Sequence, residues 1–235
     1  MKIQYHQYNI ADTINRLDTI LGENPLRYGY IHNIPVEEER AKIPMSIMHA
    51  SVLVVDIDIK SPTEVSDDIL TLKMDKLAKS EICNVMCDYA NCIDIVLGKN
   101  SVMGIYNTPI ITDVDFALDT AAKISTLSAL FEKLFTQRSI DYQVNLRIGL
   151  CYGNVYYFQI DVAGEKVVNW AGPVIDEAFN CSTSIEPRNS AIRIDNAIYN
   201  NLKKKYQEFF SKDDAYPFYY ASLINTGMKE WINSK

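Results

Sequence analysis

Two aspartates one residue apart follow a short apolar run, and they are the first residues in this chain that could do chemistry. The run is Val52 to Val55, and Asp56 and Asp58 come directly after it. Four successive branched aliphatic residues are typical of a strand that is covered on both faces. Because side chains alternate along a strand, the two carboxylates should point the same way. They predict a site for a divalent cation, although a simply solvated acidic strand end has the same pattern.

The residues after the two aspartates predict a place for phosphate groups. Ser61, Pro62, Thr63 and Glu64 have the pattern of a capping box with proline at the first helical position. A helix should therefore begin just beyond the carboxylates, and its free backbone N–H groups can bind an anion. A cation beside such amides predicts a seat for a triphosphate.

Hydrophobic periodicity around this strand predicts strands that alternate with long helices. We expect helices over residues 63–89, 113–138, 174–184 and 195–210, and strands over 92–97, 101–106, 142–150, 155–160, 166–170 and 218–224. Asp113 should cap the second helix, Gly98 to Asn100 should form a tight hairpin turn, and Gly149 and Gly153 should bracket another turn. The order of elements is then strand, helix, hairpin, helix, strand.

The same patterns predict one main domain with decorated ends. Residues 1–45 read as an N-terminal extension with a short helix over 10–21, residues 46–225 as the domain, and residues 226–235 as a C-terminal tail. The chain has 235 residues, 48% of them hydrophobic and 23% charged, which suits one globular core.

Charge and cysteine content exclude several classes of protein. The net charge of −7, with scattered lysines and arginines, argues against a nucleic-acid or anionic-membrane surface. No apolar run reaches membrane-spanning length and the first residues do not form a signal peptide, so we expect a cytoplasmic protein. The five cysteines form no C-x-x-C pair, which argues against a disulfide framework or a zinc ribbon.

Four segments in this order resemble the class III nucleotidyl cyclases, the adenylate and guanylate cyclase family. They are similar to its first metal-binding strand, its metal-binding hairpin, its arginine-isoleucine-glycine strand and its late glycine-led helix, and they cover Val52–Ile59, Gly98–Ile105, Arg147–Val155 and Asn169–Ala178. The resemblance runs over residues 48–224. It implies an α/β (α+β) fold, a ferredoxin-like or palm βαββαβ cyclase domain with an extra C-terminal strand and helix.

The resemblance also assigns metal-binding positions. The first metal aspartate of the family falls on Asp56, with the backbone carbonyl of Ile57 as its companion. The second falls on Asn100, which lies 44 positions after Asp56, the spacing that the family uses. A carboxamide supplies a neutral oxygen there, and Asp58 or Asp94 would have to supply the missing charge. A softened ligand set of this kind suits Mn²⁺ (or Mg²⁺).

Further positions carry over to the substrate. The residues that read a purine in adenylate cyclases fall on Val96 and Asn169, and the transition-state asparagine and arginine fall on Asp176 and Asn180. Contacts to the phosphates are expected from Ile59, Lys60 and Ser61.

These positions depart from the family pattern, and two interpretations follow. One is a divergent bacterial enzyme resembling the pyrimidine cyclases of Pycsar antiphage defence, which convert UTP or CTP to cUMP or cCMP. Such an enzyme would work as a homodimer with sites at the subunit interface, and a separate cyclic-nucleotide-binding effector would read its product. The other is a catalytically weak or inactive nucleotide-binding or regulatory module. A GGDEF-type dinucleotide cyclase is disfavoured, because the turn at residues 98–102 lacks that signature.

Overall fold

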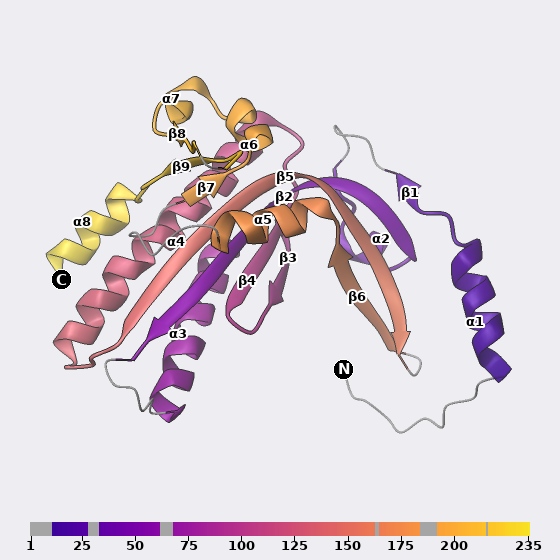
Figure 1. Cartoon of the computed structure of the whole chain (residues 1–235), viewed down its shortest axis with the longest axis horizontal. Helices are drawn as coiled ribbons and strands as arrows, with labels where there is room; N and C mark the ends of the chain where they lie inside the picture. Colours follow the sequence, from indigo (N-terminus) through magenta and orange to yellow (C-terminus); the bar gives the residue numbers. More distant parts are fainter. Residues whose placement is uncertain (1–10, 28–32, 62–67, 163–164, 184–191, 215) are drawn as a thin grey trace.

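The computed structural model describes residues 11–27, 33–61, 68–162, 165–183, 192–214 and 216–235 (Figure 1). Its elements, in chain order, are α1 (Ala11–Gly22), β1 (Leu26–Arg27), α2 (Glu37–Arg40), β2 (Met45–Lys60), α3 (Asp68–Met86), β3 (Cys92–Leu97), β4 (Ser101–Tyr106), α4 (Ile111–Gln137), β5 (Gln143–Val162), β6 (Glu165–Ala171), α5 (Pro173–Thr183), β7 (Ile192–Ile194), α6 (Asn196–Asn201), α7 (Lys204–Gln207), β8 (Ser211–Lys212), β9 (Tyr219–Ala221) and α8 (Thr226–Ser234).

Two long antiparallel strands, β2 and β5, form the middle of the sheet. They pair along the whole of β2, from Met45 opposite Phe158 to Lys60 opposite Gln143. The sheet order is β3-β4-β2-β5-β7-β9-β8, and β1 and β6 add to β2 and β5. Because β2 has a neighbour on each side and cover on both faces, residues 52–55 are completely buried. The apolar run that precedes Asp56 is thus the centre of the fold.

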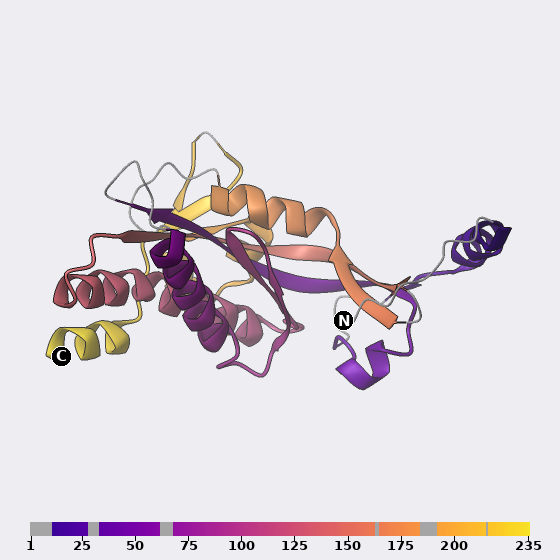
Figure 2. The same cartoon turned by 90° about the horizontal axis from the view of Figure 1, so that it is seen from below.

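Helices cover both faces of this sheet. Leu53 and Val55 join a core cluster with residues of α3 and α4, whereas Val52 and Val54 join a second cluster with residues of α5. Figure 2 shows the same division, with α5 on one side of the strands and α3, α4 and α8 on the other. The order β2-α3-β3-β4-α4-β5 confirms the predicted βαββαβ fold.

The glycines expected to bracket a turn instead lie inside one continuous strand. β5 runs unbroken through Gly149 and Gly153, so the predicted turn is wrong. A Cβ on Gly149 would lie 2.2 Å from the carbonyl oxygen of Ala178 on α5. The glycine is therefore needed for the close approach of α5 to β5 and not for a change of chain direction.

Helix ends differ from the prediction at two places, and a third prediction lies mostly outside the described residues. Asp113 is not the N-cap of α4, because the helix begins at Ile111. The carboxylate of Asp113 instead accepts a hydrogen bond from the backbone N–H of Ile110 at 3.3 Å. The single helix expected over 195–210 is two short helices, and Asp195 caps the first. The predicted capping box lies mostly in residues 62–67, outside the described residues.

The two ends of the chain are placed differently. At the C-terminal end, residues 226–234 form α8, and Lys133 of α4 donates a hydrogen bond to the backbone oxygen of Ile232. At the N-terminal end, α2 inserts the buried Arg40, which donates to the backbone oxygens of Pro35 and Ile93. Helix α1 stands apart from both (Figures 1 and 2).

Candidate active site

The ends of three strands bring the predicted metal-binding residues to one edge of the sheet. Asp56 pairs with Ser101 on β4 and with Arg147 on β5. The backbone N–H of Ile57 donates to the backbone oxygen of Asn100 at 2.8 Å, which sets the hairpin turn beside β2. Residues 44 positions apart in the sequence are therefore neighbours.

Asp56 forms an ion pair with Arg147. The Nε of Arg147 donates to Oδ2 of Asp56 at 2.8 Å, and its Nη2 donates to the same oxygen. The side chains are only 16% (Asp56) and 26% (Arg147) exposed, so this charge-assisted pair is partly shielded from water. A cation that binds Asp56 must either share the carboxylate with the guanidinium or displace it.

Asp58 lies on the same face as Asp56 but in a more open position. Its carboxylate is 3.7 Å from the Nζ of Lys60, and the two side chains are 31% and 49% exposed. An ion pair this exposed contributes little to stability, so Asp58 is available to a ligand. Ile59 and Lys60 continue β2, and Ser61 is the last residue described before the gap.

Helix α3 holds the hairpin turn that carries Asn100. The Nζ of Lys79 donates to the backbone oxygen of Lys99 at 2.8 Å and to Asp75 at 2.9 Å. The side chain of Asn100 itself is exposed. The turn is thus fixed from the helix side, and the Asn100 carboxamide faces outward.

The donors at this edge are hard oxygens, which suit Mg²⁺ or Mn²⁺. Asp56, Asp58, the Asn100 carboxamide and the Ile57 carbonyl would hold such a cation. Within the described residues, no three carboxylate, histidine or cysteine side chains gather as a ready-made metal site. The set therefore fits a cation that is held partly by the phosphates of a bound nucleotide.

The α5 residues assigned to catalysis lie on the outer side of their helix. Val174 and Ala178 are buried against the sheet, whereas Asp176 and Asn180, one helical turn apart, are exposed. They point away from the strands that carry Asp56. The structure of one chain therefore does not bring Asp176 and Asn180 to the carboxylates.

The two base-reading positions are also separated within one chain. Val96 pairs with Met103 on β4, and Asn169 pairs with Phe158 on β5. Trp170, next to Asn169, crosses to β3, where its Nε1 donates to Asp94 at 2.6 Å. Because successive strand residues face opposite ways, Asn169 points away from this contact.

Asp94 is too far along the sheet to replace the missing second metal carboxylate. It pairs with Ile105, which in turn pairs with Val52. Val52 precedes Asp56 by four residues, roughly 13 Å at ~3.3 Å per residue. The Asp94 carboxylate holds Trp170 and the backbone N–H of Ile95 instead.

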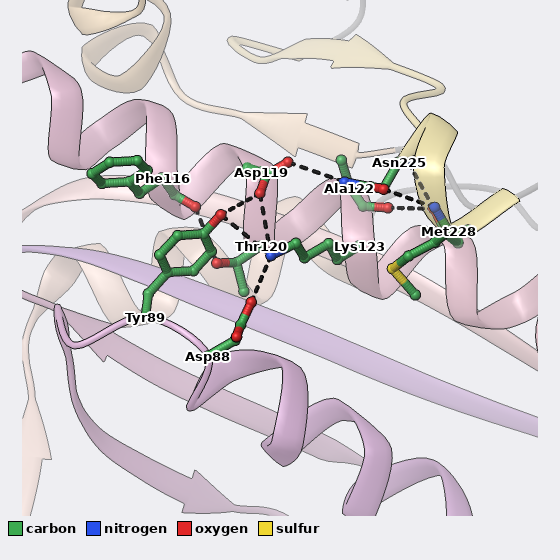
Figure 3. Close-up of polar contacts among 10 residues, drawn as sticks. Asp88, Tyr89, Phe116, Asp119, Thr120, Ala122, Lys123, Asn225 and Met228 are labelled. Carbon is green, nitrogen blue, oxygen red and sulfur yellow. Dashed lines mark hydrogen bonds and ion pairs between the residues drawn. The ribbon is translucent and has the colours of Figure 1, made fainter. Parts of the chain in front are cut away.

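A second polar cluster lies on α4, away from these carboxylates (Figure 3). Tyr89 donates to Asp119, and Lys123 donates to Asp88 at 2.6 Å and to Tyr89 at 3.3 Å. Asn225, the N-cap of α8, donates to Asp119 at 3.4 Å. The cluster thus fastens the turn after α3 and the start of α8 onto α4.

The protonation states of this cluster suit a structural role. Burial raises the pKa of Tyr89, and its bond to Asp119 raises it further. Burial alone would lower the pKa of Lys123, but its bonds to Asp88 and Tyr89 raise the pKa above its usual value. Neither group is set to exchange a proton near neutral pH. No local sequence pattern predicts this cluster, because its members come from three separate segments.

The larger cavities lie elsewhere than the carboxylate edge. One of about 830 Å³ lies between the loop before α4 and the strands near His49 and Tyr152, and one of about 770 Å³ lies along α4. Asp56, Asp58, Asn100 and Arg147 line neither.

Comparisons with known proteins give first the class of fold. No family model matches the chain. The adenylyl cyclase CyaB from P. aeruginosa superimposes with a TM-score of 0.56 at 13% identity, over 74% of this chain and 93% of that one. A class III adenylyl cyclase-like ATP-binding protein from Pseudomonas aeruginosa superimposes with a TM-score of 0.69 at 14% identity, over 94% of this chain and 48% of that one. The fold is that of class III cyclase catalytic domains.

A sequence relative then narrows the resemblance. The chain is 25% identical to the uridylate cyclase of Treponema porcinum over 214 residues, which are 86% of this chain and 73% of that protein. The predicted resemblance to class III nucleotidyl cyclases, and to their pyrimidine branch, is confirmed by these similarities.

Among the described residues, no helix combines the length with the apolar content needed to cross a lipid bilayer.

Proposed function

We propose that this chain is a nucleotide cyclase that converts UTP or CTP to the 3′,5′-cyclic monophosphate and pyrophosphate. The observation that carries the proposal is the ion pair of Asp56 with Arg147 on a class III cyclase fold, with Asp58 two residues along β2 and the backbone of Asn100 hydrogen-bonded to Ile57. The similarity to a uridylate cyclase supports a pyrimidine substrate.

The reaction forms a bond between the ribose 3′ oxygen and the α-phosphorus and breaks the bond from that phosphorus to the β-phosphate. Pyrophosphate leaves, and the hydroxyl proton passes to a carboxylate or to water. Bound Mn²⁺ or Mg²⁺ supplies the charge that lowers the pKa of the hydroxyl and neutralises the phosphates. Asp56 and Asp58 hold that charge in place, with the oxygens of Asn100 and Ile57.

Arg147 supplies a cation for the triphosphate in this proposal. Its guanidinium lies against Asp56, where the phosphates would enter, and a guanidinium binds phosphate oxygens in a fork geometry. If Asp56 held the cation, the guanidinium of Arg147 would be available to the phosphates. Ile59, Lys60 and Ser61 follow on β2 as further phosphate contacts.

The outward position of Asp176 and Asn180 supports a homodimer. These residues cannot reach Asp56 of their own chain from the exposed side of α5, but they could face a nucleotide held by a second copy. Val96 and Asn169 would contact the base in the same shared site. Asp176 and Asn180 would then contact the transition state, in which stabilisation of the developing charge is the main catalytic contribution.

The biological setting belongs to the same proposal. We infer a cytoplasmic enzyme, which the five free cysteines support. Its cyclic UMP or CMP would act as a second messenger in antiphage defence and would be read by a separate effector. We expect neither nucleic acid nor a membrane as a partner, given the net charge of −7.

A nucleotide-binding module without turnover is the second candidate. Asn100 replaces a carboxylate, and Asp56 already has a cationic partner in Arg147. One structure of similar fold is described as a cyclase-like ATP-binding protein. A protein of this kind would bind a nucleotide at the same edge without forming a cyclic product.

The two candidates are separated by incubating the protein with each of ATP, GTP, UTP and CTP and Mn²⁺. Pyrophosphate and cyclic nucleotide are measured by chromatography and mass spectrometry, and nucleotide binding by calorimetry. We expect cyclic product from UTP or CTP with wild-type protein. Binding without product from any of the four would favour the second candidate.

A further inference from the structure

The β2–β5 pair extends beyond the core as a four-stranded arm with one uncovered face. The arm consists of β1, residues 45–50 of β2, residues 155–162 of β5, and β6. One face is buried by Tyr157 and Trp170, which are 1% and 7% exposed. The opposite face, here called the arm face, carries Ile47, Tyr156, Phe158, Ile160, Val162 and Val167.

The arm face is apolar and open to solvent. Tyr156, Ile160 and Val162 are 38%, 44% and 36% exposed, and they alternate along one strand, so they share one face. Ile47 and Val167 are their cross-strand neighbours on that face. An exposed patch of contiguous apolar side chains marks a surface that binds something.

Helix α1 is a second apolar surface without a partner. Leu17, Ile20 and Leu21 are 52%, 56% and 82% exposed and lie on one side of the helix. Among the described residues, α1 makes no substantial packing contact with another element. An isolated helix shorter than ~12–15 residues is marginal in water, so the 12-residue α1 needs a surface to pack on.

We propose that α1 packs on the arm face of a second copy of this chain, and that the second copy returns the same contact. At ~1.5 Å per residue, α1 is ~18 Å long. The arm face from Tyr156 to Val162 is ~20 Å long at ~3.3 Å per residue, and its four strands are ~14 Å across at ~4.8 Å spacing. One helix, ~10 Å wide, therefore covers it.

The position of α1 favours the second copy over its own arm. β1 pairs with the outer edge of β2, and only residues 23–25, ending in Pro25, join it to α1. Both views place α1 beyond this edge and clear of the arm (Figures 1 and 2). Reciprocal exchange about a two-fold axis gives two equal contacts, which carries the buried area toward the ~800 Å² per partner of a stable interface.

The charges beside the two apolar surfaces are also complementary in sign. Arg27 and Glu165 lie at the two ends of the arm face, because they pair with Ile47 and Val162. On α1, Arg16 and Asp18 flank Leu17, about 100° to either side of it at 3.6 residues per turn. The exchange does not depend on the chemistry proposed above.

Cross-linking between two single-cysteine variants tests the exchange. In a Cys87→Ser background, which removes an exposed thiol, Leu17→Cys protein is mixed with differently tagged Ile160→Cys protein and treated with a short bismaleimide. We expect a two-chain adduct of mixed tags, at severalfold higher yield than from a control mixture of Leu17→Cys with Leu72→Cys. Leu72 is 68% exposed but lies on α3.

The other outcomes overturn the proposal. An equal yield from Leu17→Cys protein alone would mean that α1 pairs with α1, and a one-chain cross-link in the double variant would mean that α1 packs on its own arm. No adduct in any mixture would exclude the contact. Independently, Leu17→Glu with Leu21→Glu should weaken dimerisation about tenfold in sedimentation, while Leu72→Glu leaves it unchanged. An unchanged dissociation constant in the α1 variant would also overturn the proposal.

Discussion

Two aspartates of this protein are held in opposite ways. Asp56 lies within β2, four residues before the strand ends, with one guanidinium as its partner, and its side chain is 16% exposed. Asp195 is 4% exposed, and its carboxylate accepts backbone N–H groups of Ile198 at 2.7 Å and Tyr152 at 3.0 Å. A mobile cationic partner at the surface can be exchanged for a metal ion, whereas backbone amides in the interior cannot be exchanged. The first arrangement suits a ligand, and the second joins α6 to β5.

The largest expected effect is on activity at the first aspartate. Asp56→Ala should lower cyclic-nucleotide formation by about 10³-fold or more, because the metal that activates the hydroxyl loses its main ligand. The melting temperature should change little. Steady-state assays with Mn²⁺ measure the rate, and Glu208→Ala, on the exposed end of α7, is the control. Wild-type rates in Asp56→Ala would remove Asp56 from the mechanism.

The second prediction concerns stability at the other aspartate. Burial raises the pKa of Asp195, the N–H groups of Ile198 and Tyr152 lower it, and the charge of Glu177 raises it, to about 6 from 3.8. The folded protein therefore binds a proton more tightly than the unfolded chain does. The stability that this proton contributes is complete below pH 3.8 and is lost as the pH rises through about 6.

The size of this effect follows from the shift. A change of about two pKa units corresponds to ~3 kcal/mol of unfolding free energy. Denaturant unfolding of wild type and Asp195→Asn between pH 4 and 7 measures it, because the variant has no titrating group at this position. As the pH rises, the unfolding free energy of wild type should fall by that amount relative to the unfolding free energy of Asp195→Asn. Parallel stability curves would refute the assigned titration.

A third prediction separates the two roles of Arg147. Arg147→Ala should lower turnover about 30-fold, because it removes a cation from the phosphates. The same variant should bind Mn²⁺ more tightly without nucleotide, since the guanidinium no longer competes for Asp56. Calorimetry measures the metal affinity, and Arg147→Lys should recover part of the rate. Weaker metal binding in Arg147→Ala would show that the arginine positions Asp56 and does not compete for it.

The smallest expected effect is a gain at the hairpin turn. Asn100→Asp restores a charged oxygen beside Asp56 and should lower the Mg²⁺ concentration for half-maximal activity about tenfold. Titration of activity with Mg²⁺ measures the change, and Asn91→Asp, in the turn before β3, is the control. An unchanged metal requirement would mean that residue 100 does not contact the cation.

Local sequence patterns predicted most of the elements. The bounds of β3 and β4 agree with the prediction at both ends, because alternation and a glycine-led turn mark a hairpin within a few residues. The expected helix over 195–210 was wrong, because Leu202 and Lys203 have non-helical backbone conformations that divide the segment into two short helices. The expected turn at Gly149 was wrong because glycine occurs both in turns and where two elements approach closely. Only the packing of α5 shows that Gly149 serves the close approach.

The candidate site was predicted only in part. The sequence predicted that Asp56, Asp58 and Asn100 lie together. Strand alternation relates the two aspartates, and the resemblance to the cyclases supplies the spacing between Asp56 and Asn100. The sequence placed Arg147 only at the start of the segment that resembles the arginine-isoleucine-glycine strand of the family. The pairing of Arg147 with Asp56 joins residues 91 positions apart, and no local pattern encodes such a register.

The sequence by itself determined that an acidic strand end stands beside a hairpin in a βαββαβ chain, because periodicity and turn chemistry are properties of neighbouring residues. Only the tertiary structure decided which charge faces Asp56 and that Asp176 and Asn180 lie on the exposed side of α5. These depend on strand register and helix packing, which bring distant segments into contact.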